Sequence, residues 1–164
     1  MNSIATAVYQ HDMDLPSEAA TVSIARRLAA VARSGDVIAL NGDLGAGKTC
    51  FARGFIAALT GQAEEAPSPT FTLVQTYDSA RGTIWHFDLY RLARADDALE
   101  LGLEDALADG ITLIEWPERI AGLLPRERLD LTLSFDSGND NGRHLHLAGQ
   151  GDWASRLQTV VSHG

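Results

Sequence analysis

Apolar and polar positions along the chain predict helices that alternate with short strands. Over residues 17–32 apolar side chains recur every three or four positions, which indicates an amphipathic helix capped by Ser17. Two short apolar runs, Val37–Leu40 and Ile111–Ile114, are continuous, as is typical of buried strands. After the first of these runs and a glycine-rich turn, a second helix is expected over residues 50–59.

Two pairs of segments have the pattern of β-hairpins. Phe71–Tyr77 and Thr83–Phe87 are rich in β-branched and aromatic residues, and the polar connection between them is too short for any but an antiparallel pair. Leu129–Phe135 and His144–Ala148 alternate apolar with polar residues and are expected to pair through a turn over Ser137–Gly142. The sheet is therefore predicted to be mixed.

Weaker patterns complete the expected order of elements. Ile4–Gln10 is compatible with a short edge strand, and residues 96–107 form two short helices split at Gly102. A short helix is expected over residues 117–122 and a final one over Trp153–Val161. This order predicts a three-layer α/β architecture, with a parallel core, antiparallel additions and flanking helices.

Length and composition restrict the class of protein. At 164 residues the chain is expected to form one domain over residues 1–164. It lacks the roughly 18 consecutive apolar residues of a membrane span, and its first residues do not resemble a signal peptide. The single cysteine, Cys50, excludes an internal disulfide and a cysteine-rich zinc site. We therefore expect a cytoplasmic protein with no membrane partner.

The charge balance disfavours direct binding of nucleic acid. The chain has 22 acidic and 13 basic residues, and its net charge is −9. Contacts with phosphate backbones require Lys and Arg side chains. If RNA is the eventual substrate, we expect another protein to hold it.

The most specific motif is the segment Gly42-Asp43-Leu44-Gly45-Ala46-Gly47-Lys48-Thr49, a Gly-x-x-x-x-Gly-Lys-Thr sequence between a strand and a helix. Its glycines let the backbone approach a polyphosphate, toward which the loop N–H groups and the helix N-terminus point. Lys48 is expected to reach the β- and γ-phosphates, and the Thr49 hydroxyl to bind Mg²⁺. The alternative is a glycine-rich turn without a ligand. The motif predicts the fold of P-loop NTPases.

Two acidic residues end apolar strands next to this loop. Asp88 follows the strand that ends at Phe87, and Glu115 follows Ile111–Ile114. Ligands of open α/β sheets lie at the carboxyl ends of the strands, so either acid could hold Mg²⁺ or orient water. Alternatively, Glu115 caps a helix or lies on the surface, and Asp88 pairs with Arg91. Trp116 either stacks on a base or packs internally.

A proline-braced segment supplies two further hydroxyls. Ser68 and Thr70 lie in a stiff, extended stretch and resemble a switch loop that senses the γ-phosphate and metal. The alternative is an ordinary turn, because Ser and Pro are common in loops.

The histidines do not indicate a metal site. His86 alternates with aromatic residues on a strand, where a lone histidine is more often structural. His144 and His146 share one strand face, but the sequence shows no third ligand for them.

Several motifs together resemble the TsaE (YjeE) family of bacterial tRNA threonylcarbamoyladenosine synthesis. They cover most of the chain, from Leu15 to about Arg143, in the family's order. The matching segments are Gly42–Thr49, Ser68–Val74, His86–Leu92, Leu99–Asp105 and Ile114–Glu118.

The resemblance implies a weak Mg²⁺-dependent ATPase that joins TsaB and TsaD. In this family ATP binding and hydrolysis let the complex turn over, threonylcarbamoyl-AMP made by TsaC supplies the modifying group, and the chemistry on adenosine occurs in TsaD. The cofactors would be ATP and Mg²⁺, and tRNA would be reached only through the complex.

The family roles transfer to matching residues of this chain. Gly42 to Thr49 would bind phosphates, with Thr49 and Glu115 holding magnesium. Lys48, Asp88 and Glu115 are then the expected catalytic residues. Thr70 would lie in the switch-like loop and Trp116 beside the nucleotide.

This chain departs from many relatives at Cys50, where they carry a second threonine. A hydroxyl there can bond the α-phosphate, and a thiol is a weaker donor, so we expect a loss on the order of 1 kcal/mol. The alternative, which we favour, is a small buried helix residue. Leu15 and Thr21 are placed near the base by resemblance alone.

The rival function is that of a small-molecule phosphotransferase on the same fold. Such a kinase needs a second substrate pocket and usually an arginine-bearing lid. Arg91, Arg94 and Arg119 are scattered along the chain, and no lid segment stands out.

Overall fold

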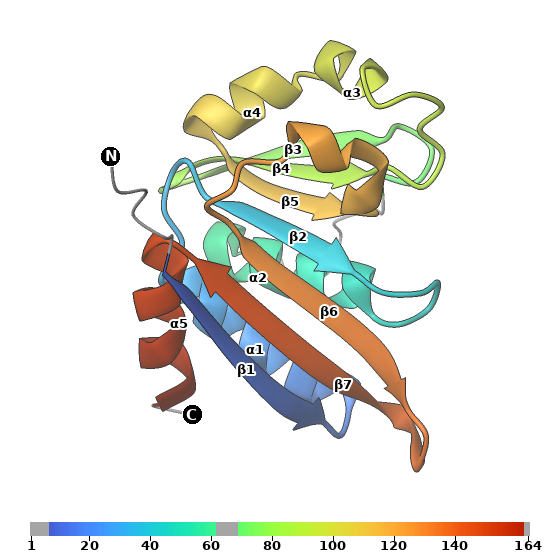
Figure 1. Cartoon of the computed structure of the whole chain (residues 1–164), viewed down its shortest axis with the longest axis vertical. Helices are drawn as coiled ribbons and strands as arrows, with labels where there is room; N and C mark the ends of the chain where they lie inside the picture. Colours follow the sequence, from blue (N-terminus) through green and yellow to red (C-terminus); the bar gives the residue numbers. More distant parts are fainter. Residues whose placement is uncertain (1–6, 62–68, 163–164) are drawn as a thin grey trace, which may run out of the picture.

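The computed structural model describes residues 7–61 and 69–162, so Ser68 of the predicted switch loop and residues 4–6 of the predicted edge strand lie outside the described residues. Seven strands form one mixed sheet in the order β1-β7-β6-β2-β5-β4-β3 (Figure 1). The strands are β1 (Val8–Leu15), β2 (Val37–Asn41), β3 (Val74–Ser79), β4 (Gly82–Asp88), β5 (Ile111–Glu115), β6 (Leu129–Asp136) and β7 (Asn139–Gln150).

The central strands are parallel and the outer ones antiparallel. β2 pairs in parallel with β5 and β6, and β4 pairs in parallel with β5. β1 with β7, β6 with β7, and β3 with β4 are antiparallel. The mixed sheet predicted from the two hairpins is confirmed.

Helices cover both faces of the sheet. The helices are α1 (Glu18–Ala30), α2 (Lys48–Thr60), α3 (Asp97–Glu100), α4 (Leu103–Asp109), the 3₁₀ helix η1 (Pro117–Leu123) and α5 (Asp152–Ser162). α1, α2 and α5 pack on one face, whereas α3 and α4 lie on the opposite side, over β4 and β5 (Figure 1). The predicted three layers are therefore present. None of the helices in the described ranges has the length and hydropathy needed to cross a bilayer.

The largest core lies between α1, α2, α5 and the sheet. Ile24 and Leu28 of α1 are buried there, as their spacing predicts, and Ser17 caps the helix by accepting a hydrogen bond from the Ala20 N–H. Gly54 of α2 faces α1, where a Cβ would lie 3.4 Å from Val22 Cα. This close helix contact holds α2, and with it the loop that precedes α2, against the sheet.

Three predicted strands have different limits, and one of them, β7, begins at Asn139, inside the predicted Ser137–Gly142 turn and before the predicted start at His144. β3 begins at Val74, not at Phe71, because Leu73 has a φ of 68° and donates its N–H to the Pro69 carbonyl in a turn. The edge strand is present but runs over Val8–Leu15, shifted from the predicted Ile4–Gln10. The propensity of Phe71–Leu73 for β structure is thus overridden by a turn beside the phosphate loop.

Candidate functional site

The phosphate loop, residues 42–49, joins β2 to α2 and requires glycine at specific positions. Gly42 has a φ of 145°, and a Cβ there would lie 2.5 Å from the Leu133 carbonyl oxygen. Gly47, with a φ of 108°, precedes α2, and no side chain caps this helix N-terminus. The first N–H groups of α2 therefore suit an anion at the loop.

The sheet brings both predicted carboxylates to this loop. β4 and β5 pair in parallel with Asp88 opposite Glu115, and Glu115 is also opposite Leu40 at the end of β2. All three strands end on the edge from which the phosphate loop departs. Asp88 and Glu115 are buried, which excludes the alternative of a surface acid for Glu115.

Glu115 is held through both of its carboxylate oxygens. Thr49 Oγ1 donates to Oε1 at 2.9 Å, and His86 Nε2 lies 2.7 Å from Oε2. The strand-end carboxylate is thereby bonded directly to the predicted magnesium ligand of the phosphate loop.

Asp88 faces the segment that follows Pro69. Thr70 Oγ1 lies 3.3 Å from Asp88 Oδ2, and the Tyr90 N–H donates to Oδ1 at 3.2 Å. The Arg91 guanidinium lies 4.8 Å from the centre of the Phe71 ring instead of pairing with Asp88. These contacts favour the site interpretation of Asp88 over the ion-pair alternative.

Lys48 and Trp116 are in direct contact. The Lys48 ammonium lies 3.4 Å from the centre of the Trp116 ring and donates to the Gly42 carbonyl. Trp116 has a φ of 61°, uncommon for a bulky residue, and its ring also packs against Tyr90. The strained backbone after Glu115 turns the indole toward the phosphate loop.

These side chains surround a cavity of about 270 Å³ at the phosphate loop. The predicted catalytic residues Lys48, Asp88 and Glu115 all line it. The remaining lining residues are Leu44, Gly45, Gly47, Thr49, Cys50, Thr70, Tyr90 and Trp116. Three other predicted loop residues, Gly42, Asp43 and Ala46, do not line this cavity. Ala46 is fully buried, its N–H donates to the Asp43 carbonyl, and Gly42 is packed against β6.

An adjoining cavity of about 460 Å³ continues from the loop toward the start of α1. It shares Gly45, Gly47 and Cys50 with the first cavity and is also lined by Thr21. Leu15, by contrast, is buried in the core and does not line it.

Arg143 of β7 is a residue of the site that sequence reasoning missed. Its Nε donates to the Ala46 carbonyl at 3.1 Å and its Nη2 to the Gly45 carbonyl at 3.2 Å. Because the Gly45 and Ala46 carbonyls accept hydrogen bonds from the Arg143 guanidinium, these bonds constrain the orientation of the loop peptides. No local pattern marks Arg143, because the contact joins residues 97 or 98 positions apart.

Burial shifts the pKa values of two residues of α2, Lys48 and Cys50, in opposite directions. Burial lowers the pKa of Lys48, and the negative charges of Glu115 and Glu118 oppose that shift. Burial, followed by the charge of Glu18, raises the pKa of Cys50 to about 11. Cys50 is only half-buried and lines both cavities, so the favoured interpretation as a small buried helix residue is not supported. Its neutral thiol excludes thiolate chemistry near neutral pH.

The donors at the loop suit a hard cation that has further ligands of its own. Thr49, Asp88 and Glu115 offer only oxygen atoms. In residues 7–61 and 69–162 no group of three His, Cys, Asp or Glu side chains is placed to hold a metal. Mg²⁺ commonly takes one or two protein ligands and completes its shell with phosphate and water.

The second pair of histidines is engaged in hydrogen bonds on the polar face of β1 and β7. His144 contacts Asp12 and Asp14, and His146 contacts Asp12. The bonds to Asp14 and Asp12 raise the pKa of His144. These carboxylates, opposite the histidines in the strand register, are the partners that the sequence did not reveal.

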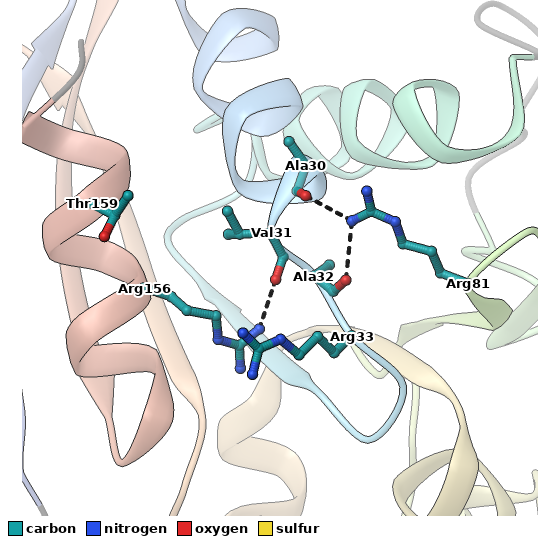
Figure 2. A pocket seen from close by; sticks show the side chains of 7 residues that line it. All are labelled: Ala30, Val31, Ala32, Arg33, Arg81, Arg156 and Thr159. Atoms are coloured by element: carbon teal, nitrogen blue, oxygen red, sulfur yellow. Dashed lines mark hydrogen bonds between the residues drawn. The ribbon is translucent and has the colours of Figure 1, made fainter.

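A different cavity, of about 630 Å³, lies at the C-terminus of α1, before β2 begins and away from the phosphate loop. Figure 2 shows that two of its arginines point at backbone carbonyls: Arg81 donates to Ala30 and Ala32 at 2.8 and 3.1 Å, and Arg156 donates to Val31 at 2.9 Å. The arginines thus satisfy the last carbonyls of a helix. We assign this cavity a structural role.

Comparisons with known proteins agree with the motif order. A family model described as "Threonylcarbamoyl adenosine biosynthesis protein TsaE" matches residues 15–145. The tRNA threonylcarbamoyladenosine biosynthesis protein TsaE of Rickettsia bellii is 45% identical over 121 residues, covering 74% of this chain and 84% of that protein. TsaE of Bacillus subtilis is 38% identical over 133 residues, covering 80% and 81%.

A solved structure extends the similarity to the fold. The crystal structure of Bacillus subtilis YdiB has a TM-score of 0.79 with this chain and is 31% identical, covering 96% of this chain and 97% of that one. The predicted P-loop fold is therefore confirmed. On the family match and the curated relatives, this chain belongs to the TsaE family.

Proposed function

We propose that this protein is the ATP-binding and ATP-hydrolysing subunit of the machinery that makes threonylcarbamoyladenosine in tRNA. The observation that carries the proposal is the convergence of Lys48, Thr49, Asp88 and Glu115 on one cavity at the phosphate loop. Family membership supplies the pathway, since the curated relatives are named for threonylcarbamoyladenosine biosynthesis.

The residues divide the binding of MgATP between them. Loop N–H groups would bind the phosphates together with Lys48, whose ammonium contacts the Trp116 ring. Thr49 Oγ1 and Glu115 Oε1 lie 2.9 Å apart. This separation matches that of neighbouring oxygens around Mg²⁺ with bonds of about 2.1 Å. Thr49 and Glu115 would hold Mg²⁺, which would supply charge stabilisation, and Asp88 would orient the attacking water.

The adjoining cavity suits the nucleoside. It begins at Gly45 and Gly47 and ends at α1, so phosphates in the loop leave the base and ribose near Glu18 and Thr21. Cys50 lines both cavities.

Exposed apolar side chains around the nucleotide cavity support docking of a protein partner. Leu44 and Tyr90 line the cavity, Phe71 follows Thr70, and the Phe135 ring lies near Gly45. All four are exposed, Phe71 to 82%. Apolar groups gathered on a surface commonly mark protein contacts. We propose TsaD and TsaB homologues as the partners, with tRNA reached only through them because the chain is acidic.

The phosphotransferase alternative has less support. No arginine lines the phosphate cavity within the described residues, and the sequence of residues 62–68 contains neither Arg nor Lys. The cavity thus offers Lys48 as its cation and no arginine-bearing lid.

Two substitutions separate binding from hydrolysis. Lys48→Ala should abolish useful binding of a fluorescent ATP analogue, because the cation that contacts the phosphates is lost. Glu115→Ala should keep much of the binding and lose phosphate release. Glu118→Ala is the matched control, since Glu118 is an exposed acid near Lys48 that lines neither cavity. Normal hydrolysis by Glu115→Ala would refute the metal assignment.

A further inference from the structure

We infer that His86 is a positioning residue for Glu115, fixing the carboxylate that faces the magnesium site; this inference rests on the proposed function. His86 Nε2 lies 2.7 Å from Glu115 Oε2. The side chains are 1% and 3% exposed, so water does not compete for the bond. A histidine that sequence reasoning treats as structural is thereby joined to the site.

The hydrogen bond has a defined direction. His86 Nδ1 is buried and has no hydrogen-bond partner among the residues that the structure describes. A proton on Nδ1 would be a buried donor without an acceptor, whereas a lone pair there is tolerated more readily. The proton therefore belongs on Nε2, which donates it to Glu115. Donation to Oε2 leaves Oε1 for Thr49 and the cavity.

The sheet fixes this geometry in advance of ligand binding. His86 lies two residues before Asp88 on β4, and β4 pairs with β5, which ends at Glu115. His86 and Asp88 consequently project from the same side of β4. One strand thus supplies both the water-orienting acid and the group that orients its neighbour.

Loss of the His86 hydrogen bond should weaken the affinity for Mg²⁺ more than the affinity for the nucleotide. Without the Nε2–H donor, the buried Oε2 loses its partner and the carboxylate is free to rotate away from Thr49. The phosphate contacts of the loop and Lys48 do not involve His86. Loss of a hydrogen bond behind a metal ligand typically weakens metal affinity about 10- to 100-fold.

The test compares His86→Leu, which removes the donor at similar size, with His86→Gln, which keeps an N–H donor. For each variant we would measure the Mg²⁺ concentration that half-saturates Mg²⁺-dependent nucleotide binding, nucleotide affinity without Mg²⁺, and kcat. For His86→Leu we expect the Mg²⁺ requirement to rise about 10- to 100-fold, metal-free affinity to stay within about twofold, and kcat to fall. His86→Gln should recover most of both losses.

Ile84→Val is the matched control, because Ile84 is buried on the same strand and face as His86. It should lower Tm without changing the Mg²⁺ requirement. A second arm introduces His86→Leu into a Glu115→Gln background. There the carboxylate that the histidine positions is already gone, so the loss of His86 should no longer affect the Mg²⁺ requirement.

An unchanged Mg²⁺ requirement in His86→Leu overturns the inference, and so does an equal effect of His86→Leu with and without Glu115→Gln. If His86→Leu does not fold, the test uses His86→Gln alone. The inference is supported if His86→Gln has the same Mg²⁺ requirement as wild type. It is overturned if the Mg²⁺ requirement of His86→Gln rises as far as that of Glu115→Gln. Failure of wild-type protein to bind MgATP would instead overturn the proposed function.

Discussion

Single residues of the site differ in how far the sequence reveals them. Lys48 and Thr49 are identified by local spacing, because their roles depend on one continuous loop. Glu115 is found by its place at the end of a buried strand. His86 and Glu115 are 29 positions apart in the sequence and meet only because their strands pair, so no local sequence pattern predicts their contact. At this scale the sequence indicates the chemistry of each residue but not which strands pair.

The reactivity of Cys50 tests the electrostatics at the residue scale. With a pKa of about 11, only about one thiol in a thousand is ionised at pH 8. Alkylation by iodoacetamide should therefore be slow at pH 8 and rise about tenfold per pH unit toward pH 11. MgATP should slow it further, because Cys50 lines both cavities.

The rate is followed by mass spectrometry of the intact protein, and Cys50 is the single cysteine in the sequence. Protein unfolded in urea is the control, since its thiol titrates near the ordinary value. A rate in the folded protein that levels off below pH 9 would show that burial does not hold the thiol neutral.

At the scale of elements, helices and buried strands follow from periodicity, whereas the segments around the site do not. Phe71–Leu73 has strand propensity but forms a turn, because the Leu73 N–H bonds back to Pro69 and the Asp88 N–H donates to the Leu73 carbonyl. The β6–β7 hairpin is predicted as a hairpin, yet its role in holding the phosphate loop through Arg143 depends on tertiary packing. Local patterns thus predict the scaffold better than the contacts between its loops.

The hairpin contact predicts a specific effect on nucleotide binding. Arg143→Met keeps much of the side-chain length but removes the donors to Gly45 and Ala46. Hydrogen bonds from a charged group contribute about 1.5–3 kcal/mol. The other contacts of the loop keep part of its conformation, so only part of this free energy is lost from binding. We therefore expect ATP affinity to fall about tenfold.

Arg128→Met is the control, since Arg128 lies before β6 at the other end of the hairpin and bonds to Asp130 and Pro125. Isothermal titration of both variants gives the comparison, with Tm measured alongside. Equal ATP affinity of Arg143→Met and wild type would mean that the loop holds its conformation without the hairpin.

The whole molecule combines an acidic chain with an apolar rim, the exposed side chains of Leu44, Phe71, Tyr90 and Phe135, around the phosphate-loop cavity. Its net charge of −9 disfavours independent binding of tRNA. The fold class was predictable because a parallel core with two hairpins follows from the order of elements. The rim was not, since Leu44, Phe71 and Phe135 come from separate loops and strands. Together these features support the proposal that another protein covers the phosphate-loop cavity.

The rim predicts a defect confined to the partner response. Phe71→Ser removes the most exposed aromatic side chain of the rim, so stimulation of ATP hydrolysis by TsaB and TsaD homologues should fall at least several-fold. Val8→Ser is the matched control, because Val8 is also exposed but lies on the edge strand β1. Phosphate release is measured over a range of partner concentrations. Equal responses of the two variants would exclude Phe71 from the docking surface.

The most direct measurement is phosphate release from MgATP by the purified protein, alone and with the TsaB and TsaD homologues of the same organism. We predict slow release alone and a clear rise when the pair is added, with no rise for Lys48→Ala. An equal rate with and without the pair, or robust phosphorylation of a metabolite that is indifferent to the pair, would contradict the proposed function.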